Sequence, residues 1–92
     1  GLIMATLVIH CTGVYGDISY TIIASLDSEK QAKKIAKEVH EAISDGNADK
    51  LNTILKYING YILDSHIVKP IQNFIVDDWY FDHTDNCNYV II

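Results

Sequence analysis

The chain has 92 residues, of which 49% are hydrophobic and 21% charged, and its net charge is −5. A chain of this length forms one domain with one modest core. The balance of apolar and charged residues is that of a globular protein and excludes a disordered one. We therefore expect a single domain over residues 1–92, in which Gly1-Leu2-Ile3, ahead of Met4, is interpreted as an expression remnant.

The basic residues are all Lys, and the chain has no Arg. Arg is the preferred side chain for binding phosphate and guanine edges. Its absence, together with the acidic net charge, predicts no direct binding of nucleic acid. The abundance of Ile, Lys, Asn and Tyr suggests AT-rich coding, as in low-GC bacteria, and an origin in a phage or mobile element.

No segment approaches the roughly 20 apolar residues of a membrane span, so we expect no membrane association. The apolar opening, Leu2 to Ile9, is too short for a secretory signal and lacks the basic residues that precede one. Two Cys do not make a disulfide framework, which predicts a cytoplasmic protein with free thiols at Cys11 and Cys87. A bridge between them would require the first and last strands to be neighbours.

The first elements predicted along the chain are two strands. Residues 2–11 are almost continuously apolar, which is typical of a strand covered on both faces or on one face plus an edge. Residues 12–17 contain turn residues, and residues 18–26 are again rich in strand-forming side chains. We interpret residues 2–26 as a hairpin.

A helix is predicted after this hairpin. Ser28 and Gln31 have the spacing of a capping box, and Gly46 is a natural stop. Apolar residues at three- and four-residue spacing form one stripe: Ala32, Ile35, Ala36, Val39 and Ile43. Three ion pairs are expected on the outer face: Glu29–Lys33, Lys34–Glu38 and Lys37–Glu41. The Lys row of this helix is interpreted as a solvated face rather than a binding patch: Lys30, Lys33, Lys34 and Lys37.

A second helix is predicted over residues 48–59, capped by Asn47, and a strand over residues 61–68. Residues 70–81 fit either a helix that begins at Pro70 or a strand over 74–81, and the aromatic content favours the strand. A turn and a final strand, 87–92, would return beside it. The expected fold is therefore α+β, an antiparallel sheet of four or five strands with a pair of helices on one face.

Few motifs point to catalysis. The sequence has no phosphate-binding Gly-rich loop, no Gly-x-Ser-x-Gly elbow, no His-Glu-x-x-His helix and no Cys-x-x-Cys pair. A zinc site could use His10, Cys11, His83 and Cys87. Adjacent strand residues point to opposite faces, however, so His10 and Cys11 do not readily converge on one ion. We expect no cofactor and no metal, and an enzyme is the less favoured interpretation.

The final third of the chain is acidic and aromatic. Residues 60–92 contain five acids and one Lys, whereas residues 27–59 contain six of each. Aromatic side chains supply interface energy, and Asp side chains around them would attract a basic partner. The predicted partner-binding residues are Asp77, Asp78, Trp79, Tyr80, Phe81, Asp82 and Asp85. The alternative is that these charges protect a sheet edge from aggregation.

We therefore expect a small, non-catalytic interaction protein that binds a protein partner, or itself as a homo-oligomer, through this C-terminal region. An alternative is a domain with a small-molecule or metal site, with or without catalysis, for which the candidates are His10, Cys11, His66, His83 and Cys87. A third interpretation is a self-assembling subunit whose exposed sheet face is covered by another copy of the chain.

Overall fold

A computed structural model of the chain describes residues 4–13, 19–64, 67–71 and 84–92. Within these residues the elements follow the order β1 (Ala5–Gly13), β2 (Ser19–Leu26), α1 (Glu29–Ser44), α2 (Ala48–Tyr57), β3 (Gly60–Asp64), β4 (Ile67–Pro70) and β5 (Thr84–Ile91). The predicted α+β fold is confirmed. No helix in the described part of the chain is long and apolar enough to cross a membrane.

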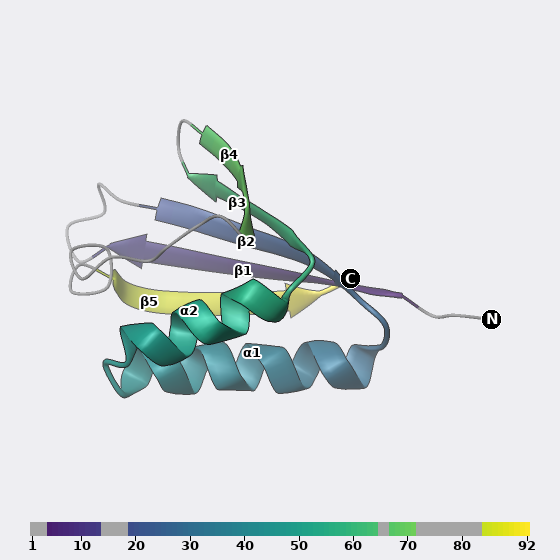
Figure 1. The fold of residues 1–92 in the computed structure, drawn as a ribbon, viewed down its shortest axis with the longest axis horizontal. Coiled ribbons are helices and arrows are strands. Elements are labelled where there is room, and N and C mark those ends of the chain that lie inside the picture. The colour runs from purple at the N-terminus through teal and green to yellow at the C-terminus, as the bar shows by residue number, and fades with distance from the viewer. Residues whose placement is uncertain (1–3, 14–18, 65–66, 72–83) are drawn as a thin grey trace.

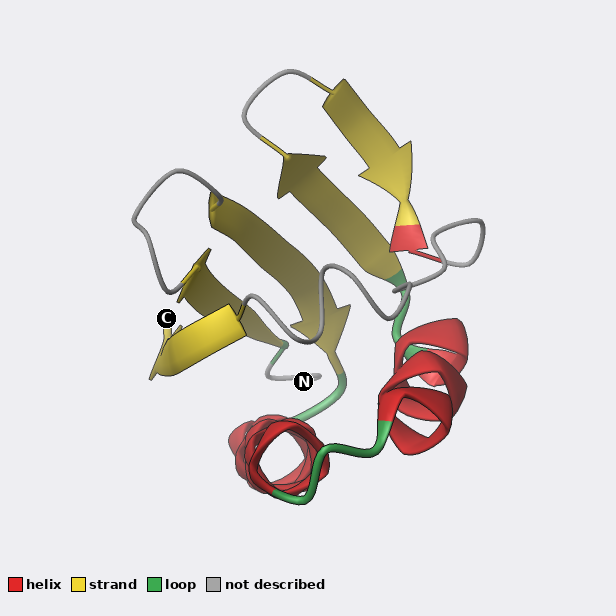
Figure 2. Ribbon diagram, turned by 90° about the vertical axis from the view of Figure 1, so that its left-hand side faces the viewer, coloured by secondary structure: helices red, strands yellow, loops and turns green. Residues whose placement is uncertain are grey.

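The strands form one sheet in the order β4-β3-β2-β1-β5, and every neighbouring pair is antiparallel. Both helices lie on the same side of this sheet, as Figure 1 shows with α1 and α2 below the strands. Figure 2 gives the same arrangement from the end, with α1 and α2 side by side under the sheet. The predicted pair of helices on one face is therefore present.

The core lies between the helices and one face of the sheet. Burial alternates along β1 and β2, so that every second side chain, such as Leu7, Ile9 and Ile22, is buried. The helix faces that pack against the sheet supply the other half of the core. From α1 these are Ala36, Val39 and further small residues, and from α2 they include Leu51 and Leu55. Of the two alternatives expected for β1, coverage on both faces is wrong. The side chains of Thr6, Val8 and His10, on the face away from the helices, are partly or fully exposed.

Local signals in the sequence set the start of α1. The hydroxyl of Ser28 accepts a hydrogen bond from the backbone N–H of Gln31 at 3.2 Å. The Gln31 side chain accepts from the N–H of Asp27 at 3.0 Å, one residue earlier than in a standard capping box. Along the outer face, Lys33 pairs with Glu29 at 3.2 Å as predicted.

The two other predicted ion pairs of α1 are not present among the described residues. Glu41 instead lies 3.8 Å from the ammonium of Lys50, which belongs to α2. This contact joins the two helices across their connection. Both partners are largely exposed, so its contribution to stability is small.

The connection between the helices is short and its residues are those expected. Gly46 has a positive φ of 65°, a conformation that favours glycine. The Asn47 side chain accepts from the N–H of Lys50 at 3.0 Å and so caps α2. The helix ends at Tyr57 rather than at Asn59, because Ile58 is already extended and turns its side chain into the core.

The predicted strand over residues 61–68 is wrong in one respect. The chain reverses direction within it, and β3 pairs with β4 in an antiparallel hairpin in which Asp64 is opposite Ile67. The sequence between these two residues, Ser65-His66, contains none of the Gly or Asn that usually signal a tight hairpin turn. A hairpin there was therefore not predicted.

The predicted strand over residues 74–81 lies outside the described residues, as does most of the turn that was expected to follow it. The final strand exists, but it begins earlier than expected, at Thr84, and its partner in the sheet is β1. The N- and C-terminal strands are thus neighbours (Figure 1).

Gly60 marks the closest approach of two strands. It is opposite Ala24, and a Cβ atom on Gly60 would overlap the carbonyl oxygen of Ile23 and lie 2.8 Å from the Cα of Ala24. Backbone atoms of a central strand cannot move aside without disturbing the ladder. We expect Gly60→Ala to lower the free energy of unfolding by about 2–3 kcal/mol, as measured by urea denaturation.

The control for this variant is Asn59→Ala, one residue earlier. Asn59 is exposed and uses its backbone carbonyl, not its side chain, to accept from Ser25. This change should shift stability by no more than about 0.5 kcal/mol. Equal effects of the two variants would contradict the close approach at Gly60.

Candidate functional site

The acidic-aromatic segment, residues 77–85, lies mainly outside the described residues. Of the predicted contact residues, Asp85 alone falls on a described element, near the start of β5. Its backbone is placed, whereas Asp77, Asp78, Trp79, Tyr80, Phe81 and Asp82 are not described. The last two residues of the segment, Thr84 and Asp85, are the first two residues of β5.

Within the described part of the chain, β5 is an edge strand of the sheet. From Asn86 to Ile91 it has no charged residue and no Pro, the residues that usually protect such an edge. The opposite edge, β4, has four residues and ends at Pro70, both of which discourage pairing with another chain. The predicted edge protection by Asp side chains does not extend along β5, because its one acid is at Asp85.

Large hydrophobic side chains on β5 and just after it are exposed to solvent. Tyr89 and Val90 on the strand are exposed, Val90 to 53%, and so is Ile92, the residue that follows it. Cys87 and Ile91, by contrast, are partly buried and pack against the core. Among the side chains of β5 that the structure describes, Cys87 and Ile91 therefore contribute to the core, whereas Asn88, Tyr89 and Val90 are exposed.

The backbone of β5 also presents groups along the outer edge. Thr6 and Ile92 exchange both backbone hydrogen bonds, at 3.1 and 2.9 Å. Hydrogen-bonded and non-hydrogen-bonded pairs alternate along an antiparallel ladder. Tyr89 and Ile91 are therefore in non-hydrogen-bonded pairs with β1, and their N–H and C=O groups point away from it, toward the outer edge.

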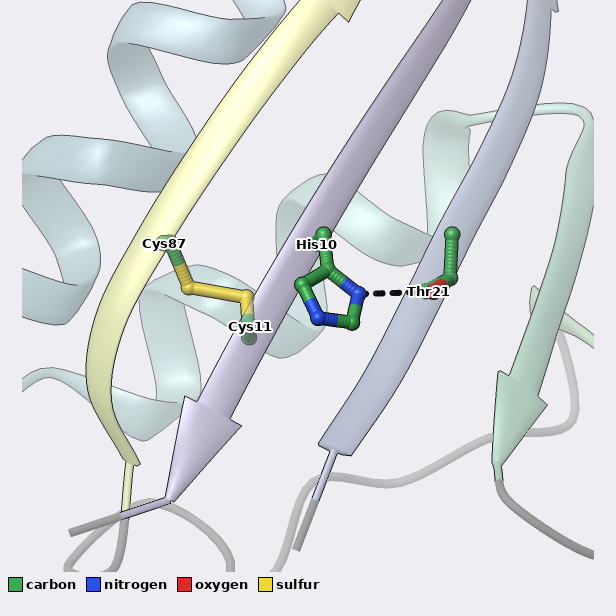
Figure 3. The surroundings of a disulfide bond; sticks show 4 residues. All are labelled: His10, Cys11, Thr21 and Cys87. Carbon is green, nitrogen blue, oxygen red and sulfur yellow. Dashed lines mark hydrogen bonds between the residues drawn. A yellow bond between two sulfur atoms is a disulfide. The ribbon is translucent and has the colours of Figure 1, made fainter. Parts of the chain in front are cut away.

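Cys11 and Cys87 form a disulfide across β1 and β5 (Figure 3). The two residues are direct cross-strand partners, with Cα atoms 4.2 Å apart and a sequence separation of 76. Their position is again a non-hydrogen-bonded one, where the Cα atoms come closest. The prediction of two free thiols is wrong, because the first and last strands are neighbours and bring the two sulfur atoms together.

The candidate metal ligands that the structure describes, His10, Cys11 and Cys87, do not converge on one site. His10 lies on the exposed side of β1, whereas Cys11 is fully buried on the helix side. The disulfide removes both thiolates as ligands, and His66 and His83 lie outside the described residues. Among the residues that the structure describes, no group of three potential metal ligands and no pocket are found.

His10 has a different partner. Its Nδ1 lies 3.0 Å from the hydroxyl of Thr21, its direct neighbour on β2. Figure 3 shows this contact in front of the strands, with the helices behind them. The hydrogen bond therefore lies on the side of the sheet that neither helix covers, which we call the open face.

A row of apolar residues crosses the open face. Val90 on β5 is opposite Val8 on β1, Val8 is opposite Ile23 on β2, and Ile23 is opposite Tyr61 on β3. We call these four residues the apolar row. Val8 and Ile23 are partly exposed, and Tyr61 is 56% exposed.

Sequence reasoning anticipated an exposed face but not the apolar row. The alternation of burial along residues 19–26 is visible in the sequence, whereas the register between four strands is not. Comparison of the chain with known proteins finds no matching family model, no matching curated protein and no matching solved structure. The function is therefore inferred from these surfaces.

The disulfide should contribute strongly to stability, because it closes a long loop of the unfolded chain. For a separation of 76 residues, the chain-entropy relation gives about 4 kcal/mol. We expect Cys11→Ser with Cys87→Ser to lower the free energy of unfolding by about 2–4 kcal/mol in urea denaturation.

The control for this pair of substitutions is the unmodified chain in a strong reductant, which should approach the same stability. A double variant as stable as the oxidised chain would show that the bridge does not form.

Proposed function

We propose that this chain is a non-catalytic interaction domain that binds a protein partner, or another copy of itself, through its C-terminal region. The observation that supports the proposal best is β5, an edge strand that carries no charge after Asp85, has exposed apolar side chains and begins where the acidic-aromatic segment ends. Contiguous exposed apolar surface on a small protein commonly marks an interaction site.

The two parts of this region would have different roles. Trp79, Tyr80 and Phe81 are the proposed anchors, because large aromatic side chains dominate interface energies. Asp77, Asp78, Asp82 and Asp85 would accelerate association with a basic partner and select against acidic ones. β5 would supply further apolar contact and, along its outer edge, backbone groups for an added strand.

The cellular location is part of the proposal. Cytoplasmic location and an origin in a phage or mobile element remain predictions from composition. The disulfide weighs against a permanently reducing compartment, because such bonds persist mainly in oxidising ones. Trapping the thiols by alkylation at the moment of cell lysis would show which state the chain has where it is made.

Loss of the proposed anchors should release the partner. We expect Trp79→Ala with Asp78→Asn to weaken binding by about ten-fold or more, because truncation of an aromatic anchor removes a large share of interface energy. The measurement is capture from lysate by the immobilised chain, followed by titration of each captured protein at low and high salt.

The matched control is Tyr57→Ala with Asp27→Asn. It removes the same kinds of group, an aromatic ring and one carboxylate, from exposed positions at the end of α2 and ahead of α1. Binding that survives the first pair of substitutions, or is lost equally in both, would contradict the proposed surface.

A further inference from the structure

We propose that the open face packs against the open face of a second copy of this chain, forming a symmetric dimer. This inference rests on the proposed function, since it names the partner and adds a second contact surface beside the acidic-aromatic segment. Four features of the described residues support it: the charge of the face, its apolar row, the hydrogen-bonded pair of His10 and Thr21, and its area.

The first feature is charge. The chain has a net charge of −5, so most contacts between two copies bring like charges together. On the open face, the described side chains include no carboxylate and no ammonium. They are Thr, Ser, Asn and apolar residues, with His10 as the one titratable group apart from Tyr61. Two copies can approach through this face without that repulsion.

The second feature is the order of side chains in the apolar row. The row begins with the small Val90, continues through Val8 and Ile23, and ends with the large Tyr61. A two-fold axis between Val8 and Ile23 would place Val90 of each copy against Tyr61 of the other. Large residues opposite small ones fill an interface without voids, so the row is complementary to itself.

The third feature is the polar row beside it. A buried polar group without a partner costs about 1–3 kcal/mol. His10 and Thr21 already satisfy each other at 3.0 Å, in the positions next to Val8 and Ile23. Covering this part of the face therefore does not leave the imidazole Nδ1 or the Thr21 hydroxyl unpaired.

The fourth feature is area. With the axis between β1 and β2, four strands of each copy overlap, because β4 lies beyond β5 of the other copy. Four strands spaced about 4.8 Å apart, each offering roughly six residues of about 3.3 Å, give on the order of 400 Å² per copy. Two copies would bury on the order of 800 Å², which is the size of a weak, transient contact. Sheets in such a pair would pack about 10 Å apart with aligned strands. The expected dimer is reversible and weak rather than obligate.

The test is the mass of the chain in solution as its concentration rises. Sedimentation equilibrium between about 10 and 500 µM covers dissociation constants in the micromolar range. We expect the wild-type chain to pass from monomer to dimer. Tyr61→Lys should raise the dissociation constant at least ten-fold, because each dimer loses two aromatic contacts and gains two ammonium groups.

The matched control is Tyr57→Lys, the same substitution at a tyrosine that is 84% exposed on α2, on the other side of the sheet. It should leave dimerisation unchanged. Val90→Lys provides a second variant at the other end of the row, in case Tyr61→Lys alters folding. Circular dichroism and urea unfolding of dilute samples check that each variant keeps the fold.

A wild-type chain that stays monomeric over this range would overturn the inference, as would equal weakening by Tyr57→Lys and Tyr61→Lys. The proposed function would still stand if a different protein is captured and then lost with Trp79→Ala and Asp78→Asn. A dimer that is lost with those two substitutions but kept with Tyr61→Lys would show that the copies bind each other through the acidic-aromatic segment. That result would contradict the open-face dimer and leave the proposed function intact.

Discussion

The pairing of β1 with β5 is the constraint on which the other features of this protein depend. It joins strands from the two ends of the chain, and bringing such distant segments together carries a large loop-closure cost. The pairing puts Cys11 opposite Cys87, makes β5 the edge of the sheet and brings Val90 beside Val8. The disulfide, the edge position of β5 and the β5 end of the apolar row thus all follow from the register in which β5 pairs with β1.

The helices cover only one side of the sheet, so the two faces of the strands differ in burial. Along β1 and β2, every second side chain is buried in the core, and the side chains between them are mostly partly exposed on the opposite face. Leu7 and Ile9 are fixed by packing against α1 and its neighbours. Val8, between them, has no such role in the core and belongs to the apolar row on the open face.

The sequence predicts the parts of this fold that depend on neighbours along the chain. Ser28, Gly46 and Asn47 act within one turn of a helix, and their roles are as expected. The β3–β4 hairpin was missed because Ser65-His66 carries no turn signal. The disulfide differs from the prediction of free thiols, because that prediction rests on the expected reducing compartment and not on the distance between the two Cys residues. The first error comes from a local turn without a sequence signal, whereas the second concerns which strands are neighbours, and this depends on contacts distant in sequence.

The same limit applies to the candidate site. The acidic-aromatic segment is evident from composition, since its charges and rings lie close together in the chain. The apolar row is not, because its members come from four strands and become neighbours only through the register of the sheet. No two of them are adjacent in sequence, and each alone is an ordinary strand residue.

The Cys11–Cys87 bridge also determines how the domain responds to mechanical force. Residues 12–86 lie inside the covalent loop that it closes. When the chain is pulled by its ends, tension passes from β1 to β5 through the sulfur atoms and bypasses both helices. At about 3.5 Å per residue, on the order of 260 Å of chain is withheld from extension until the bridge is reduced. The oxidised domain would therefore behave under load as a short, nearly inextensible link.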